Sequence, residues 1–263
     1  MFNFHRFLTI GHFFLKDALS FRASFFITKL REVLSFLTIL IFWYAVLIIY
    51  QIPFGSYTPT LMFSYFAYTF IIQQIISTTR LHVLGNSIIS GEFTRLLLYP
   101  IAFLPLFLAW ETIHKAFNLF IALIYVLPLF YLLKNHLYFP SVSNFATFLP
   151  FLLIGLILFT LLTLIINSLA FYTTELWAVN FLLLILTGFL NGGYFPLDLL
   201  GPWATLNPFA YLNYWPSRLL LGSVNFISLT TAFWVGLLWI LIFYLIYRFS
   251  WSKGLRRYTG WGT

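Results

Sequence analysis

Three ionisable residues, Glu111, His114 and Lys115, have the types and the spacing that acid–base chemistry would use. Residues three and four positions apart lie on one face of a helix, so these side chains can meet there. The same spacing suits an ion pair within the helix, and we favour that structural role. A membrane-embedded enzyme acting on lipids or glycans, with this cluster as its polar centre, is the less favoured alternative.

Other chemical motifs are missing. The chain has no cysteine, which excludes disulfides and thiolate ligands or nucleophiles. It has no Gly-x4-Gly-Lys-Ser/Thr phosphate loop, no His-Glu-x-x-His, no Gly-x-Ser-x-Gly and no glycine-rich dinucleotide motif. The five histidines are scattered along the chain, which favours interfacial histidines over a metal or haem site. We therefore expect no catalytic residue, metal or cofactor in this chain, and any ATP dependence must come from another subunit.

The elements that surround these residues are apolar. Of 263 residues, 62% are hydrophobic and 8% are charged, and the mean hydropathy is +0.95. This composition leaves too little polar surface to coat a water-soluble globule. The apolar runs are long and mostly free of charge rather than alternating, which indicates helices. The sequence therefore predicts an all-α, polytopic membrane protein.

We expect six spans, each near the ~20 residues that cross a bilayer core. They are residues 33–50, 61–79, 116–133, 148–170, 176–195 and 229–247. The third span is taken to begin after Lys115, because a charge at mid-bilayer costs roughly 2.5 to 3.5 kcal/mol. Residues 1–32 mix phenylalanines with basic residues and should form an interfacial helix, a seventh span being the weaker alternative.

Basic residues indicate the orientation. With six spans, 12 of the 14 lysines and arginines lie on one side, and only Lys134 and Arg218 lie on the other. The positive-inside rule makes the first side cytoplasmic, so both termini are expected in the cytoplasm. The net charge of +8 is thereby explained by topology and by contacts with membrane lipids, and it does not indicate nucleic acid.

A charged segment, residues 90–100, falls on the cytoplasmic side between the second and third spans. Ser90 can cap a helix, Glu92 lies in its first turn, and Pro100 prevents its continuation. Glu92 and Arg95 share one face and can form an ion pair. Another face carries an apolar ridge of Phe93, Leu96 and Leu97. Such a helix suits a groove in a cytosolic protein, or alternatively the lipid surface.

The stretch between the fifth and sixth spans, residues 191–228, places helix breakers in apolar sequence rich in Trp and Tyr. Its only charges are Asp198 and Arg218. Irregular backbone is tolerated at membrane depth where protein covers it or where it lines a water-filled cavity. We expect re-entrant helices that form an outer gate, with an ordinary loop as the alternative. The gate residues are Phe195, Pro196, Asp198, Pro208 and Pro216.

Uncharged polar residues within the spans are weaker candidates, either for a cargo path or for contacts between helices. They are Gln73, Gln74, Asn118, Asn167 and Asn180. No acidic pair lies within a span, which disfavours the principal alternative function, an ion-coupled secondary transporter or channel.

Two patterns resemble a known family. Ser-Gly-Glu-x-x-x-Leu-Leu-x-x-Pro, matched at Ser90, Gly91, Glu92, Leu96, Leu97 and Pro100, is similar to the permeases of the ABC-2 family of ABC transporters. Residues 193–200, followed by Asn207-Pro208-Phe209 and Tyr214-Trp215-Pro216, resemble the sequence before the last span in one bacterial branch of that family. The resemblance covers nearly the whole chain.

This resemblance implies a single ABC-2-type transmembrane domain over residues 1–263, acting in a bacterial inner membrane as a subunit of an ATP-driven exporter. It implies a coupling helix within residues 90–100 that docks on separate ABC ATPase subunits, which bind ATP and Mg. It also implies a second six-span permease, identical or homologous. Two positions depart from the family pattern: Thr94 replaces an acidic residue and Tyr99 replaces an arginine.

Overall fold

A computed structural model of the chain describes residues 22–77, 83–98, 103–222 and 224–259. Within these ranges the backbone forms helices joined by turns, and no strand. The all-α prediction is therefore confirmed for this part of the chain. The interfacial helix expected over residues 1–32 falls largely outside the described residues.

Four described helical segments are long and apolar enough to cross a membrane. They are α2 (Arg22–Tyr44) with the π-helical turn η1 (Ala45–Ile49), α6 (Phe103–Leu133), α7 (Val142–Ser168) and α10 (Phe226–Arg257). Because a helix pairs its backbone polar groups internally, such segments can cross hydrocarbon. The chain is thus a multi-pass membrane protein.

Two further helices lie among these four but are shorter. α3 (Pro59–Ile76) has 18 residues and α8 (Trp177–Leu190) has 14. At 1.5 Å per residue they are about 27 Å and about 21 Å long. α8 ends earlier than the predicted 176–195 because Asn191 is followed by two glycines, and Gly192 has φ +84°.

Local sequence explains where two of the helices begin. The Thr58 side chain accepts a hydrogen bond from the Leu61 N–H at 3.3 Å, and Pro59 occupies the first turn of α3. Ser141 caps α7 in the same way, by accepting from the Asn144 N–H at 3.3 Å. Hydroxyl caps therefore start both helices.

Two helices begin before the predicted starts of the first and third spans. α2 begins at Arg22 and α6 at Phe103, so Glu32 and the 111–115 cluster lie inside helices. Their charges have partners: Lys29 Nζ lies 3.0 Å from Glu32 Oε2, and the Tyr125 hydroxyl donates to the same oxygen at 3.1 Å. Lys115 donates to the carbonyl of Ile76 and lies 5.1 Å from the centre of the Phe159 ring. Charged side chains that have such partners can lie within a long apolar helix.

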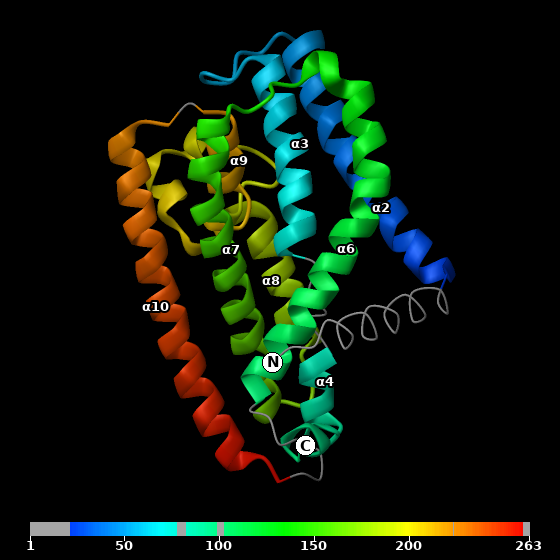
Figure 1. Ribbon diagram of the computed structural model, residues 1–263, viewed down its shortest axis with the longest axis vertical. Coiled ribbons are helices and arrows are strands. Elements are labelled where there is room, and N and C mark those ends of the chain that lie inside the picture. The colour runs from blue at the N-terminus through cyan, green and yellow to red at the C-terminus, as the bar shows by residue number, and fades with distance from the viewer. Residues whose placement is uncertain (1–21, 78–82, 99–102, 223, 260–263) are drawn as a thin grey trace.

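Short helices occupy the two ends of the molecule (Figure 1). α4 (Val83–Ile89) and α5 (Phe93–Leu97) lie near the C-terminal end of α10. The opposite half holds α9 (Tyr214–Leu220) and three 3₁₀ helices, η4 (Leu197–Leu200), η5 (Pro202–Leu206) and η6 (Pro208–Tyr211). The 3₁₀ helices η2 (Lys134–His136) and η3 (Leu169–Phe171) follow α6 and α7.

α7 and α10 pack along each other around a buried tyrosine. Tyr211 is fully buried, stacks on Phe151 with ring centres 6.2 Å apart, and donates its hydroxyl proton to the Ala232 carbonyl at 2.6 Å. A Cβ at Gly155 would lie 2.4 Å from the Tyr211 carbonyl oxygen, and one at Gly236 would lie 2.7 Å from its ring. These glycines therefore let α7, α10 and η6 approach closely.

Gly155→Ala should destabilise the protein by about 1–3 kcal/mol, because the new methyl group meets backbone that cannot rotate away. Gly188→Ala is the matched control, since its methyl would meet only the half-exposed Tyr194 side chain. Thermal unfolding in detergent compares them. Equal unfolding midpoints for the two variants would contradict the packing described here.

Candidate functional site

The first candidate site is the pair α4 and α5, joined by a tight turn at Gly91. Gly91 has φ +81°, which a residue with a side chain rarely adopts. This turn places Glu92 at the N-cap of α5, with no side-chain cap bond, and leaves Ser90 outside the helix. The Ser90 hydroxyl instead donates to the Ser87 carbonyl at 3.4 Å. The prediction that Ser90 caps the helix is wrong for this reason.

The charged and apolar faces predicted for this segment also need correction. Glu92 and Arg95 are both described and exposed, and no ion pair joins them. Phe93 is fully buried, whereas Leu96 is half-buried and Leu97 is 45% exposed. Leu98, which the predicted ridge omitted, is 80% exposed. The exposed apolar surface is therefore Leu97 and Leu98, and Pro100 lies outside the described residues.

Phe93 is buried because four aromatic rings enclose it. The rings come from the start of α6, from η3 and from the C-terminal end of α10, with centres 5.2 to 6.1 Å from the Phe93 ring and near-perpendicular planes. They belong to Phe103, Phe171, Trp251 and Tyr258. Edge-to-face contacts of this kind stabilise aromatic clusters beyond their burial. Phe93 is an anchor and does not face outward.

Tyr258 also binds the backbone of this segment. Its hydroxyl donates to the Gly91 carbonyl at 2.9 Å and accepts from the Thr94 N–H at 3.1 Å. The Thr94 hydroxyl lies 2.9 Å from the Tyr258 hydroxyl oxygen. Thr94 thus has a local partner in this chain. Sequence reasoning missed Tyr258, which is 164 residues away from Thr94.

α4 is held by Asn167, one of the weaker candidates. The fully buried Asn167 accepts from the Gly85 N–H at 2.6 Å and donates to the Thr163 carbonyl at 2.7 Å. Asn118 donates to the His114 carbonyl and Asn180 to the Leu176 carbonyl, each one turn earlier. These three asparagines make structural contacts and do not line the large cavity described below.

A groove of about 490 Å³ runs beside the end of α4. Its walls are the C-terminal part of α4 and the turn before α8: Asn86, Ile89, Ser90, Thr174, Glu175, Leu176 and Trp177. Glu175 supplies an acidic side chain, and Trp177 is 71% exposed. The groove and the exposed residues of α5 are two candidate contact surfaces, and Ser90 in the groove wall directly precedes the turn at Gly91.

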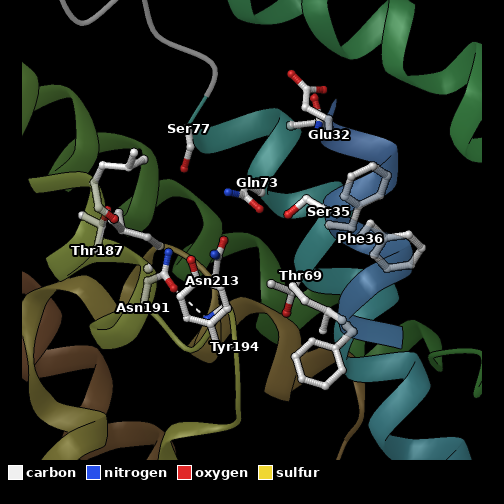
Figure 2. Close-up of a pocket in the computed structure, with 18 of the residues that line it drawn as sticks. Glu32, Ser35, Phe36, Thr69, Gln73, Ser77, Thr187, Asn191, Tyr194 and Asn213 are labelled. Atoms are coloured by element: carbon white, nitrogen blue, oxygen red, sulfur yellow. Dashed lines mark hydrogen bonds between the residues drawn. The ribbon is translucent and has the colours of Figure 1, made fainter. Parts of the chain in front are cut away.

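A second cavity, about 450 Å³, lies between α2, α3 and the end of α8 (Figure 2). Its polar lining is mostly uncharged and includes the predicted residues Gln73 and Gln74, with Ser35, Thr69, Ser77, Thr187, Asn191 and Asn213. Arg31 and Glu32 supply the charged groups. Aromatic rings complete the walls: Phe36, Phe66, Phe70, Phe159 and Tyr194.

Asn213 has an unusual position in this cavity. It is fully buried, and neither its amide oxygen nor its amide nitrogen bonds another described residue. Burying such an amide without partners costs roughly 1–3 kcal/mol, so a water or ligand group would stabilise it. Sequence reasoning missed Asn213, which lies between η6 and α9. The composition of this segment does not show that it lines the cavity.

The two charges within residues 191–228, named here the outer region after its predicted location, lie close together. Arg218 Nη2 lies 3.7 Å from Asp198 Oδ2, and the Tyr57 hydroxyl donates to both carboxylate oxygens at 2.9 and 3.0 Å. The guanidinium also lies 5.0 Å from the centre of the Tyr57 ring. Burial raises the pKa of Tyr57 far above its usual range, so the hydroxyl keeps the proton that it donates. Sequence reasoning noted both charges but missed Tyr57.

Aromatic side chains satisfy the irregular backbone of the outer region. Trp43 donates to the Tyr194 carbonyl at 3.1 Å, and Tyr65 donates to that of Gly192 at 2.8 Å. Of the other predicted gate residues, Pro196 and Pro216 are buried, while Phe195 and Pro208 are half-buried. An ordinary exposed loop does not fit this burial.

His114 and Lys115, from the cluster that the enzyme alternative would use, make contacts within and between helices. Lys115 donates to the Ile76 carbonyl, and Asn118 lies within hydrogen-bond distance of the His114 ring. Among the described residues, no three His, Cys, Asp or Glu side chains are grouped closely enough to hold a metal ion.

Comparison with protein-family models matches residues 33–262 to the ABC-2 family transporter proteins. No curated protein and no solved structure gave a match. The family match extends from the first long helix to the end of the last, so it includes both candidate sites and the cavity. The chain therefore belongs to the ABC-2 family of transporter proteins and is a permease subunit of an ABC transporter.

Proposed function

We propose that this permease belongs to an ATP-driven exporter and that α4 and α5 dock on a separate ABC ATPase, which binds ATP and Mg. The observation that carries the docking role is the two-sided character of α5. Phe93 and Thr94 fix one side to the permease, whereas Arg95, Leu97 and Leu98 are exposed on the other. A short helix held rigidly from behind can transmit a push from a partner.

We assign six spans to α2, α3, α6, α7, α8 and α10, with both termini in the cytoplasm of a bacterial cell and the spans in its inner membrane. Exposed basic side chains support this orientation. Arg95, Lys253, Arg256 and Arg257 are exposed at the end of the molecule that carries α4 and α5 (Figure 1). By the positive-inside rule, this end faces the cytoplasm.

A second permease, identical or homologous, covers the cavity between α2 and α8 in this proposal. Exposing amide and hydroxyl groups to lipid tails costs free energy, because the tails offer no hydrogen-bond partners. α8 also presents bulky exposed apolar side chains toward its surroundings, including Trp177, Phe181 and Leu184. The two subunits would then share a cargo path, and lipids would surround the remaining faces.

Cargo would enter the cavity while the outer region is closed. Asn213 offers a buried amide without a partner in the described chain, and it lines the cavity. ATP binding would close the ATPases, move α5 and rearrange the outer region. The Tyr57, Asp198 and Arg218 contacts would hold that region closed at rest.

The double variant Arg95→Glu with Leu98→Asp should reduce the amount of bound ATPase at least about tenfold, equivalent to about 1.4 kcal/mol or more of binding free energy. The variant reverses the charge of Arg95 and removes the apolar contact of Leu98. Both side chains are exposed, so the permease should still fold. The measurement is the amount of ATPase that co-purifies from membranes in mild detergent. Leu200→Asp, an exposed leucine at the opposite end, is the control. Undiminished ATPase in the double variant would count against docking at α5.

Arg218→Ala should loosen the outer region, because Asp198 would lose its cation while Tyr57 alone remains. The pair is partly exposed, so we expect about fivefold faster amide hydrogen exchange over residues 191–213, equivalent to about 1 kcal/mol. Lys134→Ala, which removes an exposed cation elsewhere, is the control. Identical exchange in the two variants would contradict a closing role for the pair.

A further inference from the structure

We propose that Tyr258 is a positioning residue that fixes the ATPase-docking segment to the last helix, so that α10 carries movement of this segment to the outer region. The inference rests on the proposed docking role of α4 and α5. It assigns the transmission to one helix and names the contact at its inner end.

The inner contact is made by one hydroxyl with three polar groups. Tyr258 donates to the Gly91 carbonyl and accepts from the Thr94 N–H, and its oxygen is also within hydrogen-bond distance of the Thr94 hydroxyl. The bonds therefore hold the turn before α5 and the first turn of α5 together. Any displacement of α5 must either move Tyr258 with it or break these bonds.

α5 depends on this anchor for its position. It has five residues, and a helix of this length is not stable alone in water. Phe93 packs edge-to-face on Trp251 and Tyr258, with ring centres 5.8 and 5.6 Å apart. The polar contacts and two of the four ring contacts thus join α5 to the C-terminal end of α10 and its cap Tyr258, while Phe103 and Phe171 supply the other two ring contacts.

α10 reaches the outer region without interruption. It is one helix of 32 residues, about 48 Å long at 1.5 Å per residue. In its N-terminal half, the Ala232 carbonyl accepts from Tyr211 at 2.6 Å, and Trp239 donates to the Leu206 carbonyl at 2.9 Å. The helix that is bound to the docking segment is therefore also bound to η5 and η6.

α7 offers a second route through Asn167 and α4. Asn167 accepts from the Gly85 N–H at 2.6 Å, but Leu97 and Leu98 belong to α5 and its C-cap and not to α4. A push on Leu97 and Leu98 reaches Tyr258 first, because Thr94 and Phe93 lie on the same short helix as Leu97. The two routes make different predictions for Tyr258 and Asn167 variants.

The first test measures the anchor in the full-length permease without its ATPase. The chain has no cysteine, so Leu98→Cys and Lys253→Cys, both at exposed positions, can be spin-labelled specifically. Pulsed electron spin resonance in lipid nanodiscs gives the distance distribution between the labels. Tyr258→Phe should broaden this distribution, and Thr94→Val should broaden it in the same direction. The Tyr258→Phe and Thr94→Val double variant should broaden the distance distribution little more than either single variant, because both changes break the same contact.

Tyr172→Phe is the matched control. The Tyr172 hydroxyl lies at the same end of the molecule and bonds no other described residue. The substitution removes this hydroxyl and keeps the ring, which lies 5.2 Å from the Arg257 guanidinium carbon. An unchanged distribution in both Tyr258→Phe and Thr94→Val would overturn the anchor, whatever binds to α5.

The second test measures transmission in the assembled permease–ATPase complex. A non-hydrolysable ATP analogue should change amide hydrogen exchange over residues 191–213 in the unmodified complex. Tyr258→Phe should keep the ATPase bound yet reduce that change by about fivefold or more. Asn167→Ala, which releases α4, should reduce it less. An undiminished response in Tyr258→Phe would overturn transmission through α10, whereas failure of the unmodified permease to retain any ATPase would overturn the docking role itself.

Discussion

The structure depends on one constraint: irregular backbone that is buried within a membrane protein must find hydrogen-bond partners inside the protein. Residues 191–213 form turns and 3₁₀ helices, and their carbonyls cannot pair along a long helix. Trp43, Tyr65 and Trp239 reach them from α2, α3 and α10. An aromatic ring that carries one polar hydrogen suits this task, because its body packs in an apolar core while its tip binds a carbonyl. The many aromatic residues of this chain thus have a structural use beyond lipid contact.

The same solution recurs at the end that carries α4 and α5, where Tyr258 and Asn167 bind the backbone around α5 and in α4. Long helices therefore hold two irregular ends through side-chain hydrogen bonds. Such bonds can break and re-form while the helices stay intact. A transport subunit needs this combination of rigid spans and movable ends, because closing and opening must occur without exposing helix backbone to lipid.

The sequence predicted the features that depend on local composition. Long apolar runs indicated an all-helical membrane protein, whereas the predicted fifth span ran past Asn191-Gly192-Gly193, where α8 ends. It could not predict features that depend on distant partners. The third span was predicted to begin after Lys115 because of the cost of a buried charge, and the sequence does not show that the carbonyl of Ile76 accepts from this side chain. Phe93 was assigned to an exposed ridge, since spacing alone does not show that Phe171 and Trp251 enclose it.

The transport role is tested most directly by identifying the proteins that accompany the unmodified chain when it is purified from its native membrane in mild detergent. We expect an ATPase with a phosphate-binding loop in stoichiometric amount, together with a second permease chain, identical or homologous. ATP should also drive transport when this assembly is reconstituted into vesicles. Purification of the chain without any ATPase, combined with transport driven by an ion gradient alone, would contradict the proposed role.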